Sequence, residues 1–254
     1  MKLTVLGCSG GIGSGRQTTC YEIDDDTLLD AGTGLTSLTL EQLAGIDQVF
    51  LTHSHLDHVL GLPLLLDAVG DKRQAPVTVY ALPEVLAILD QHLFNWKLWP
   101  DFRHIPSPDR SWLRFHPVPL GSTVKVGQRE FTPLPADHVV PGCAWHIRGP
   151  GGSLVFSGDT TSNEAFILAL NHIPDLRHLI IETSFENALV EIAVASKHHW
   201  PDSLARDLER LSAQPQVWIT HLKPGNEAAI MAELAEAVPD RNLQALQQQQ
   251  VIAW

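Results

Sequence analysis

The sequence predicts an α/β protein built in layers, with two halves that share one site. Short apolar strand patterns alternate with segments of helical periodicity along the chain, as in layered α/β folds. A strand-rich stretch followed by mixed strands and helices occurs twice, before and after about residue 120. Several of these strands end directly in histidine or aspartate, and strand ends are where such folds build their sites.

In the first half, apolar runs bounded by turn residues predict five strands. They are Lys2–Gly7, Thr18–Ile23, Thr27–Asp30, Gln48–Thr52 and Val77–Tyr80. The second and third form a hairpin around the run Asp24-Asp25-Asp26. Apolar residues at helical spacing predict helices at Thr36–Leu43, Val59–Ala68 and Glu84–Leu93.

Residues 94–119 differ from their surroundings, because they are rich in Trp, Pro and His and weakly periodic. We expect a loop-rich insertion or lid here, within a single domain that spans residues 1–254. Aromatic rings stack on nucleic-acid bases, so a purine could lie on this segment, which contains Phe94, Trp96, Trp99 and Phe102. A hydrophobic lid or the contact of a homodimer is the alternative.

The strand pattern resumes in the second half. Strands are predicted at Thr123–Val126, Glu130–Pro135, Ala144–Ile147, Ser153–Phe156, Leu179–Glu182, Val217–Thr220 and Val251–Trp254. Helices are predicted at Ser203–Leu211 and Glu227–Val238. No linker and no repeat of 20–50 residues divides the chain.

The composition combines acidity with many histidines. The chain has 29 acidic and 17 basic residues, a net charge of −12 and 13 histidines. This charge excludes a simple polyanion binder, which grips phosphates with clustered Lys and Arg. The three widely spaced cysteines, the missing signal peptide and the lack of an apolar run long enough to span a membrane predict a cytoplasmic protein.

The segment His53-Ser54-His55-Leu56-Asp57-His58 directly follows a predicted buried strand. Imidazole and carboxylate are ligands of zinc and similar divalent ions. On a loop that leaves a strand, His53 and His55 can face one point, and Asp57 and His58 a second point nearby. A lone histidine pair would be typical of a solvated turn, but this dense pattern predicts a metal site.

Three further residues stand in similar places. His138 follows the strand Glu130–Pro135, Asp159 follows Ser153–Phe156, and His221 follows Val217–Thr220. Each alone would be read as a turn or capping residue. Together with the first segment they complete the ligand set of a metal site.

In this order, these residues resemble the metallo-β-lactamase superfamily, and LLDAGTG at 28–34 is similar to its early Asp-Gly turn. The resemblance covers nearly the whole chain and implies a four-layer αββα sandwich. It also implies two divalent metal ions, with zinc expected and manganese or iron as alternatives. His53, His55 and His138 would hold the first ion; Asp57, His58 and His221 would hold the second, and Asp159 would bridge them.

A narrower resemblance is to the class II cyclic-nucleotide phosphodiesterases. It rests on the segments LGCSGG (6–11), HSHLDHVLGLP (53–63), HLFNWKLWPDF (92–102), IETSFEN (181–187) and ITHLKP (219–224). That family and the related tRNA 3′-processing endonucleases place a histidine before a helix. His198 matches by its distance to Pro201, and His199 is the alternative.

The resemblance implies hydrolysis of a 3′,5′-cyclic nucleotide such as cAMP or cGMP, a small-molecule substrate, by attack of a metal-bridging hydroxide. The ribose O3′ is a poor leaving group, so His198 is expected to protonate it, with Glu182 as its orienting partner. Asp57 belongs to both the metal-ligating and the catalytic residues. Asp30 and Asp137 are expected to support ligand imidazoles from behind.

Other functions stay open on the sequence alone. Relatives of this phosphodiesterase family include arylsulfatases, so an arylsulfatase or another phosphodiester or sulfate ester hydrolase is an alternative. A tRNA 3′-processing endonuclease would need a basic arm, but Lys72-Arg73 is the only adjacent basic pair. A non-catalytic nucleotide-binding module is the most distant alternative, since the ligand set is complete.

Overall fold

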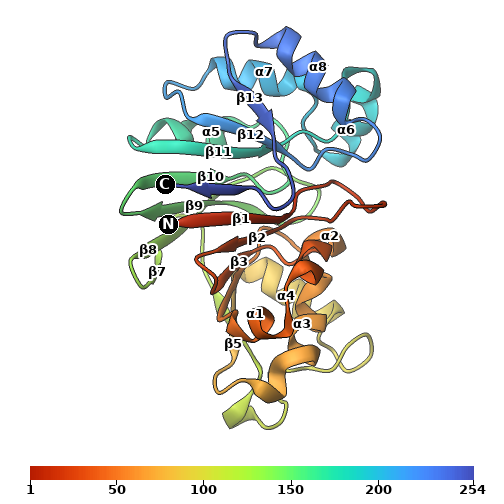
Figure 1. Ribbon diagram of the computed structural model, residues 1–254, viewed down its shortest axis with the longest axis vertical. Helices are drawn as coiled ribbons and strands as arrows, with labels where there is room; N and C mark the ends of the chain where they lie inside the picture. Colours follow the sequence, from red (N-terminus) through yellow and green to blue (C-terminus); the bar gives the residue numbers. More distant parts are fainter.

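The computed structural model describes all 254 residues and shows four layers (Figure 1). Two seven-stranded β-sheets lie face to face, and helices cover the outer side of each. This arrangement confirms the predicted α/β class and the αββα sandwich. None of the helices combines the length and the apolar character that a membrane span requires.

The first sheet has the strand order β14-β1-β2-β3-β4-β5-β6. Its strands are β1 (Lys2–Gly7), β2 (Cys20–Ile23), β3 (Thr27–Leu29), β4 (Gln48–Phe50), β5 (Val77–Ala81), β6 (Leu113–Pro117) and β14 (Val251–Ala253). Strands β2 and β3 form the expected antiparallel hairpin, whereas β3 to β6 run parallel. The carboxyl ends of β3 to β6 therefore open at one edge of the sheet.

The second sheet has the order β13-β12-β11-β10-β9-β8-β7. Its strands are β7 (Val124–Val126), β8 (Arg129–Pro135), β9 (Cys143–Gly149), β10 (Gly152–Phe156), β11 (Leu176–Glu182), β12 (Gln216–Thr220) and β13 (Leu243–Ala245). Strands β10 to β13 run parallel, so β10, β11 and β12 also end at a common edge.

Helices α1 to α4 lie on the outer side of the first sheet and α5 to α8 on that of the second (Figure 1). They are α1 (Leu40–Gly45), α2 (Leu56–Val59), α3 (Gly61–Val69), α4 (Pro83–His92), α5 (Glu164–Asn171), α6 (Val190–Ser196), α7 (Pro201–Glu209) and α8 (Glu227–Ala237). Helix α1 begins later than predicted because Thr39 caps it in a reciprocal box with Gln42. Helices α2, α5 and α6 and strands β6 and β13 were not predicted from the sequence.

Aromatic side chains fill the space between the two sheets. The ring of Phe50 on β4 stacks on Phe131 of β8, with centroids 3.9 Å apart, and meets the edge of Trp145 on β9. The indole of Trp145 donates a hydrogen bond to the carbonyl of Leu51 at 3.0 Å. Buried aromatic pairs of this kind stabilise an interface by more than the burial of their apolar area alone. They therefore help to hold the two sheets together.

The C-terminal strand β14 belongs to the first sheet, although the second half of the chain precedes it. Strand β14 pairs antiparallel with β1, and the amino group of Met1 donates to the carbonyl of Trp254 at 3.2 Å. The last residues of the chain therefore form an edge strand of the first sheet. Sequence order alone placed this strand in the second half.

The aromatic-rich segment differs from the expectation in two ways. Residues 113–117 form the edge strand β6, so the irregular part is shorter than predicted. Phe94 and Phe102 are buried in the core, where their rings lie 6.3 Å apart, so of the two alternatives left open by the sequence, stacking on a base does not apply to these rings. Helix α4 and strand β6 need apolar partners, and these rings supply them; Trp96 alone is largely exposed, at 62%.

Candidate metal centre

The polar residues singled out from the sequence meet where the strands of both sheets end. His53, His55, Asp57 and His58 follow β4 in the first sheet. His138, Asp159 and His221 follow β8, β10 and β12 in the second sheet, and Glu182 is the last residue of β11. Because the sheets pack face to face, these ends lie opposite one another and the side chains converge.

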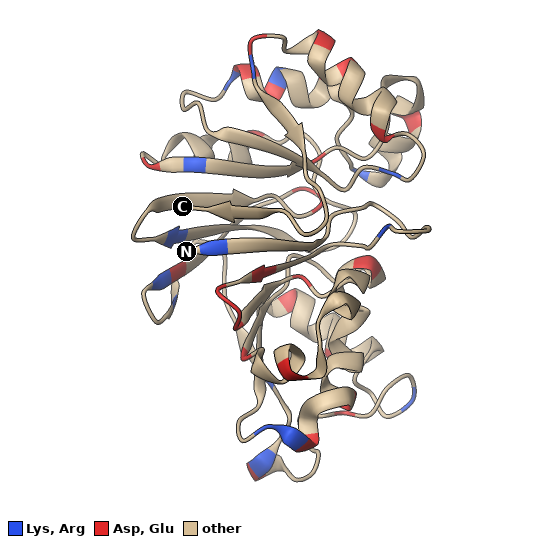
Figure 2. Cartoon of the chain, viewed as in Figure 1, with Lys and Arg blue, Asp and Glu red and all other residues tan.

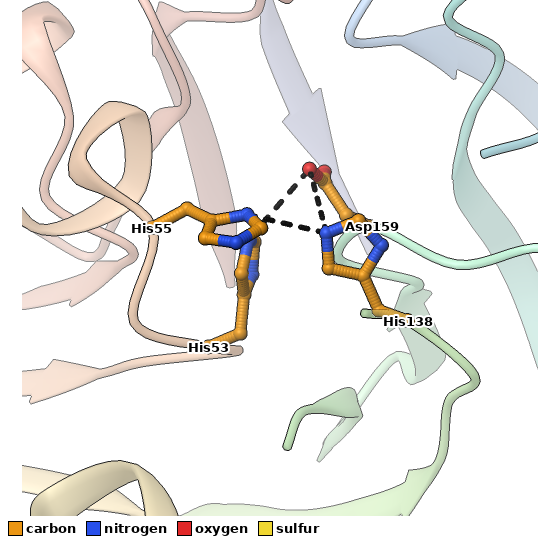
Figure 3. Close-up of side chains that lie close together, drawn as sticks. All are labelled: His53, His55, His138 and Asp159. Carbon is orange, nitrogen blue, oxygen red and sulfur yellow. Dashed lines mark hydrogen bonds and ion pairs between the residues drawn. The ribbon is translucent and has the colours of Figure 1, made fainter. Parts of the chain in front are cut away.

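A first group contains His53, His55, His138 and Asp159 (Figure 3). Their potential ligand atoms all lie within 4.8 Å of one another. The Nε2 atom of His138 lies 3.2 Å from Nδ1 of His55, and Nε2 of His53 lies 3.7 Å from Oδ2 of Asp159. Three imidazoles and one carboxylate thus point at one small volume.

A second group contains Asp57, His58, His221 and again Asp159, within the same 4.8 Å limit. The Nε2 atom of His221 lies 3.2 Å from Oδ2 of Asp57 and 3.4 Å from Oδ2 of Asp159. The Nε2 atom of His58 lies 3.3 Å from Oδ1 of Asp159. Asp159 therefore belongs to both groups and stands between them.

Two buried nitrogen atoms indicate what these groups are suited to hold. Nε2 of His53 and Nε2 of His58 are buried without any hydrogen-bond partner in the protein. A buried polar atom without a partner is costly, and the nitrogen and oxygen donors around both atoms are those that divalent ions prefer. Burial holds the pKa of His53 well below its ordinary value, which keeps this imidazole in the neutral form that binds metals.

Asp30 supports the second group from behind, as expected from the sequence. Its buried carboxylate accepts hydrogen bonds from the backbone N–H and the hydroxyl of Thr52, at 2.7 and 2.8 Å. The same carboxylate lies 2.7 Å from Nδ1 of His58. A carboxylate on the far nitrogen fixes the orientation of an imidazole, so Nε2 of His58 stays aimed at Asp159.

Asp137 does not support an imidazole, which corrects the expectation. Its carboxylate lies 2.7 Å from Nζ of Lys197. The backbone carbonyl of Lys197, 3.1 Å away, is instead the partner of Nδ1 of His138. Residue 137 precedes the ligand on an irregular loop, where alternation along a strand no longer determines which way a side chain points.

Beside Asp159 stands a pair formed by Glu182 and His198. Oε1 of the fully buried Glu182 lies 2.7 Å from Nδ1 of His198, and both side chains form a third group with Asp159. Burial disfavours the protonated form of His198, but the carboxylates of Glu182 and Asp159 outweigh it and raise its pKa. Burial acts to raise the pKa of Glu182, but the neighbouring His198 lowers it overall.

The structure separates the two adjacent histidines that the sequence left as alternatives. His198 faces the polar centre, with its ring centroid 5.3 Å from that of His221 and 5.0 Å from that of His138. His199 belongs to none of the three groups and packs with its Nδ1 atom 2.9 Å from the hydroxyl of Ser203.

Ser184 was not predicted, although it touches three of these side chains. Its hydroxyl oxygen lies 2.9 Å from Nδ1 of His221, 3.1 Å from Nδ1 of His198 and 3.1 Å from Oε2 of Glu182. It is fully buried. The only signal in the sequence was its place in the segment IETSFEN, because a serine carries no mark of such a position.

The glycine-rich loop after β1 packs against His221. A Cβ atom on Gly10 would lie 2.3 Å from the carbonyl oxygen of His221, so no larger residue fits without movement. The backbone N–H of His221 donates to the carbonyl of Cys8 at 2.9 Å, which fixes the contact. The loop positions a predicted ligand, and it starts no helix after Ser9 that would make that residue a nucleophile.

Comparison with known proteins assigns the chain to a class. The family model described as a beta-lactamase superfamily domain matches residues 26–239, and the chain belongs to the metallo-β-lactamase superfamily. Its fold is that of the metal-dependent hydrolases in this superfamily, and the clustered His and Asp side chains fit a divalent metal.

Within that class, the chain is similar to proteins named as cyclic-nucleotide phosphodiesterases. It is 25% identical to a probable 3′,5′-cyclic-nucleotide phosphodiesterase of Yersinia pestis, over 88% of this chain and 78% of the relative. The crystal structure of unliganded yeast PDE1 has a TM-score of 0.82, with 19% identity and 98% of each chain covered.

RNA-cleaving members of the superfamily are also similar. The endoribonuclease ysh1 of Schizosaccharomyces pombe is 25% identical over 70% of this chain, but the match spans only 26% of that relative. The short form of human tRNase Z has a TM-score of 0.69 with 17% identity, covering 100% of this chain and 99% of the human one. At such identities, the solved structures establish the fold alone.

Proposed function

We propose that this protein is a metal-dependent phosphodiesterase that hydrolyses 3′,5′-cyclic nucleotides, cAMP or cGMP, to 5′-nucleotides. The observation that carries the proposal is the position of Asp159. This carboxylate is shared by two ligand groups and lies beside the His198–Glu182 pair. A two-ion site with an adjacent proton donor suits cleavage of a phosphodiester that has an alkoxide leaving group.

The proposed ligands are those predicted from the sequence. His53, His55 and His138 would hold one ion, Asp57, His58 and His221 the other, and Asp159 would contribute to both. Zinc suits this set, which manganese and iron also accept. When bound, two divalent ions lower the pKa of water and neutralise phosphoryl oxygens.

His198 is the proposed general acid. Its Nδ1 atom is engaged by Glu182, which leaves Nε2 to carry the proton that O3′ of the ribose takes when the P–O3′ bond breaks. Glu182 is the positioning residue: it orients the ring and favours its protonated form. The product keeps its phosphate on O5′, as a 5′-monophosphate.

The charge distribution favours a small substrate over RNA. Lys and Arg are scattered among acidic residues in Figure 2. Near the centre, Lys197 is paired with Asp137, and Lys223 donates to the carbonyl of Gly10. Arg73, Arg110 and Arg114 line a separate cavity with the residues that precede β5 and β6, at the opposite strand ends. An RNA substrate would need phosphate contacts around the centre itself.

A substrate panel on the metal-loaded protein tests the proposal. We expect hydrolysis of cAMP or cGMP and of bis-p-nitrophenyl phosphate, and loss of both activities after chelation. Turnover of an aryl sulfate or of a tRNA precursor without cyclic-nucleotide turnover would contradict it. Fewer than one bound ion per chain, together with no hydrolysis, would support the non-catalytic alternative.

A further inference from the structure

A cavity of about 540 Å³ adjoins the candidate centre on its β5 side. Its walls come from three places: the residues after β5 (Leu82, Pro83, Glu84), the residues after β6 (Pro119, Leu120) and the loop 136–142 between β8 and β9. His138 belongs both to this wall and to the first ligand group. The cavity therefore continues the site along the edge where parallel strands end, which is where α/β folds bind ligands.

The walls offer apolar surface to the solvent. Leu120 is 52% exposed and Val139 is 49% exposed, and Leu82, Val140 and Pro141 line the same cavity. Ligand pockets are mostly apolar with a few polar groups that set orientation. A flat heterocycle has the apolar faces that such walls cover, and in a nucleotide it is joined to the phosphate through a single ribose.

The two carboxylates of the cavity differ in whether another side chain already binds them. The carboxylate of Asp137 is taken by Lys197, at 2.7 Å. Glu84, in the first turn of α4, has no hydrogen bond or ion pair from its side chain. A carboxylate accepts two hydrogen bonds side by side. Guanine offers two adjacent donors, N1–H and N2–H, whereas adenine places an acceptor at N1.

We propose that this cavity binds the purine base of the nucleotide and that Glu84 selects guanine over adenine. The inference rests on the proposed phosphodiesterase function, because it places the phosphate at the candidate centre and the base in the adjoining cavity. The cavity would hold the base in place of Phe94 and Phe102, which cannot stack on it because both rings are buried.

Exchange of Glu84→Gln tests the selection of the base. The amide of glutamine can donate to N1 of adenine and accept from its amino group, so the change should favour cAMP. We expect the ratio of kcat/KM for cGMP over cAMP to exceed one in the wild type and to fall roughly 10-fold in the variant. A ratio near or below one in the wild type, or an unchanged ratio in the variant, would overturn the assignment.

Glu41→Gln is the matched control, because Glu41 is also exposed, lies in the first turn of a helix and does not line the cavity. Both glutamates favour their helix through its dipole, so both exchanges should cost similar stability. Only Glu84→Gln should change the ratio of the two substrates.

Leu120→Asp tests the apolar wall. A charge on this wall should lower kcat/KM for cGMP roughly 10-fold, whereas the loss with bis-p-nitrophenyl phosphate should be clearly smaller, because its nitrophenyl rings have no ribose that fixes them in the cavity. Leu98→Asp, a change at a similarly exposed loop leucine outside the cavity, should affect neither substrate. Equal losses with both substrates in Leu120→Asp would count against a base-binding cavity.

The experiments distinguish an error in the proposed base site from an error in the proposed phosphodiesterase function. If bis-p-nitrophenyl phosphate is cleaved but neither cyclic nucleotide is, the proposed function is wrong. Inhibition of that cleavage by GMP and AMP then examines the cavity directly. Stronger inhibition by GMP that is lost in Glu84→Gln supports the base site, and equal inhibition by both nucleotides overturns it.

Discussion

The turn between α6 and α7 places two adjacent histidines in two different polar regions. His198 enters the candidate centre, where Glu182 and Asp159 face it. His199 enters a closed region under α7, where its ring meets Ser203 and its Nε2 atom lies 3.8 Å from Asp207. The same residue type therefore lies in two different surroundings, which differ in the groups that each ring contacts.

The electrostatics of the two regions run in opposite directions. Burial disfavours the charged form of both rings. At His198 the nearby carboxylates outweigh burial and raise the pKa, whereas at His199 burial prevails over Glu182 and Asp207 and lowers it. An acid that must hold a proton suits the first region, and a neutral packing residue suits the second.

Exchange of each histidine for alanine tests the comparison most strongly. His198→Ala should lower kcat about 10²- to 10⁴-fold, the usual contribution of a general acid. The metal content should stay unchanged, because His198 is not one of the proposed ligands. His199→Ala is the matched control and should leave kcat close to that of the wild type.

Loss of bound metal in His198→Ala would identify this residue as a ligand instead. Equal losses of kcat in the two variants would remove the distinction between the regions. The measurements are steady-state kinetics on a cyclic nucleotide and metal analysis of both purified proteins.

Glu182→Gln should have a smaller effect that depends on pH. The carboxylate favours protonated His198, and the amide does not, so the pKa of His198 should fall in the variant. Since protonated His198 is the active form, activity falls as the pH rises past its pKa. This fall should occur at a lower pH in the variant than in the wild type. We expect a deficit of about 10-fold at mildly alkaline pH that narrows as the pH decreases. A uniform deficit across the pH profile would indicate a structural role only.

Ser184→Ala should have a smaller effect still. The hydroxyl contacts His198, His221 and Glu182, and a hydrogen bond of this kind is worth about 0.5–1.5 kcal/mol. We therefore expect kcat to fall roughly 3- to 10-fold with KM nearly unchanged. Ser184→Thr keeps the hydroxyl and should recover part of the rate. No recovery, or a change in KM alone, would contradict a positioning role.

Much of the centre could be predicted because its residues follow strands. The segment from His53 to His58 comes after β4, and His221 comes after β12, so a pattern of buried strand and polar end was enough to expect convergence. The order of His138 and Asp159 along the chain supplied the remainder, through the resemblance to a known family.

The parts that could not be predicted depend on contacts between distant segments. Strand β14 pairs with β1 across almost the whole length of the chain, which no local pattern reports. The choice between His198 and His199 depends on the left-handed backbone of Lys197, with a φ of 54°, and on the start of α7 at Pro201. The burial of Phe94 and Phe102 depends on the core that α4 and β6 require.

The smallest expected effect is on the free energy of unfolding, through the packing of His199 under α7. His199→Ala should remove about 1–3 kcal/mol at neutral pH, because it leaves a cavity and removes the hydrogen bond between the ring and Ser203, whose hydroxyl keeps only its bonds to the backbone of Trp200. Below the ordinary pKa of histidine, unfolded wild-type protein takes up a proton at His199 that the folded protein resists, since burial lowers the pKa of this ring. The wild type therefore loses stability with acidification that the variant keeps, and urea unfolding should show the gap between them narrowing from about pH 7.5 to about pH 5.5. A gap that stays constant over this range would mean that His199 titrates alike in both states, and the contrast with His198 would then lack its electrostatic basis.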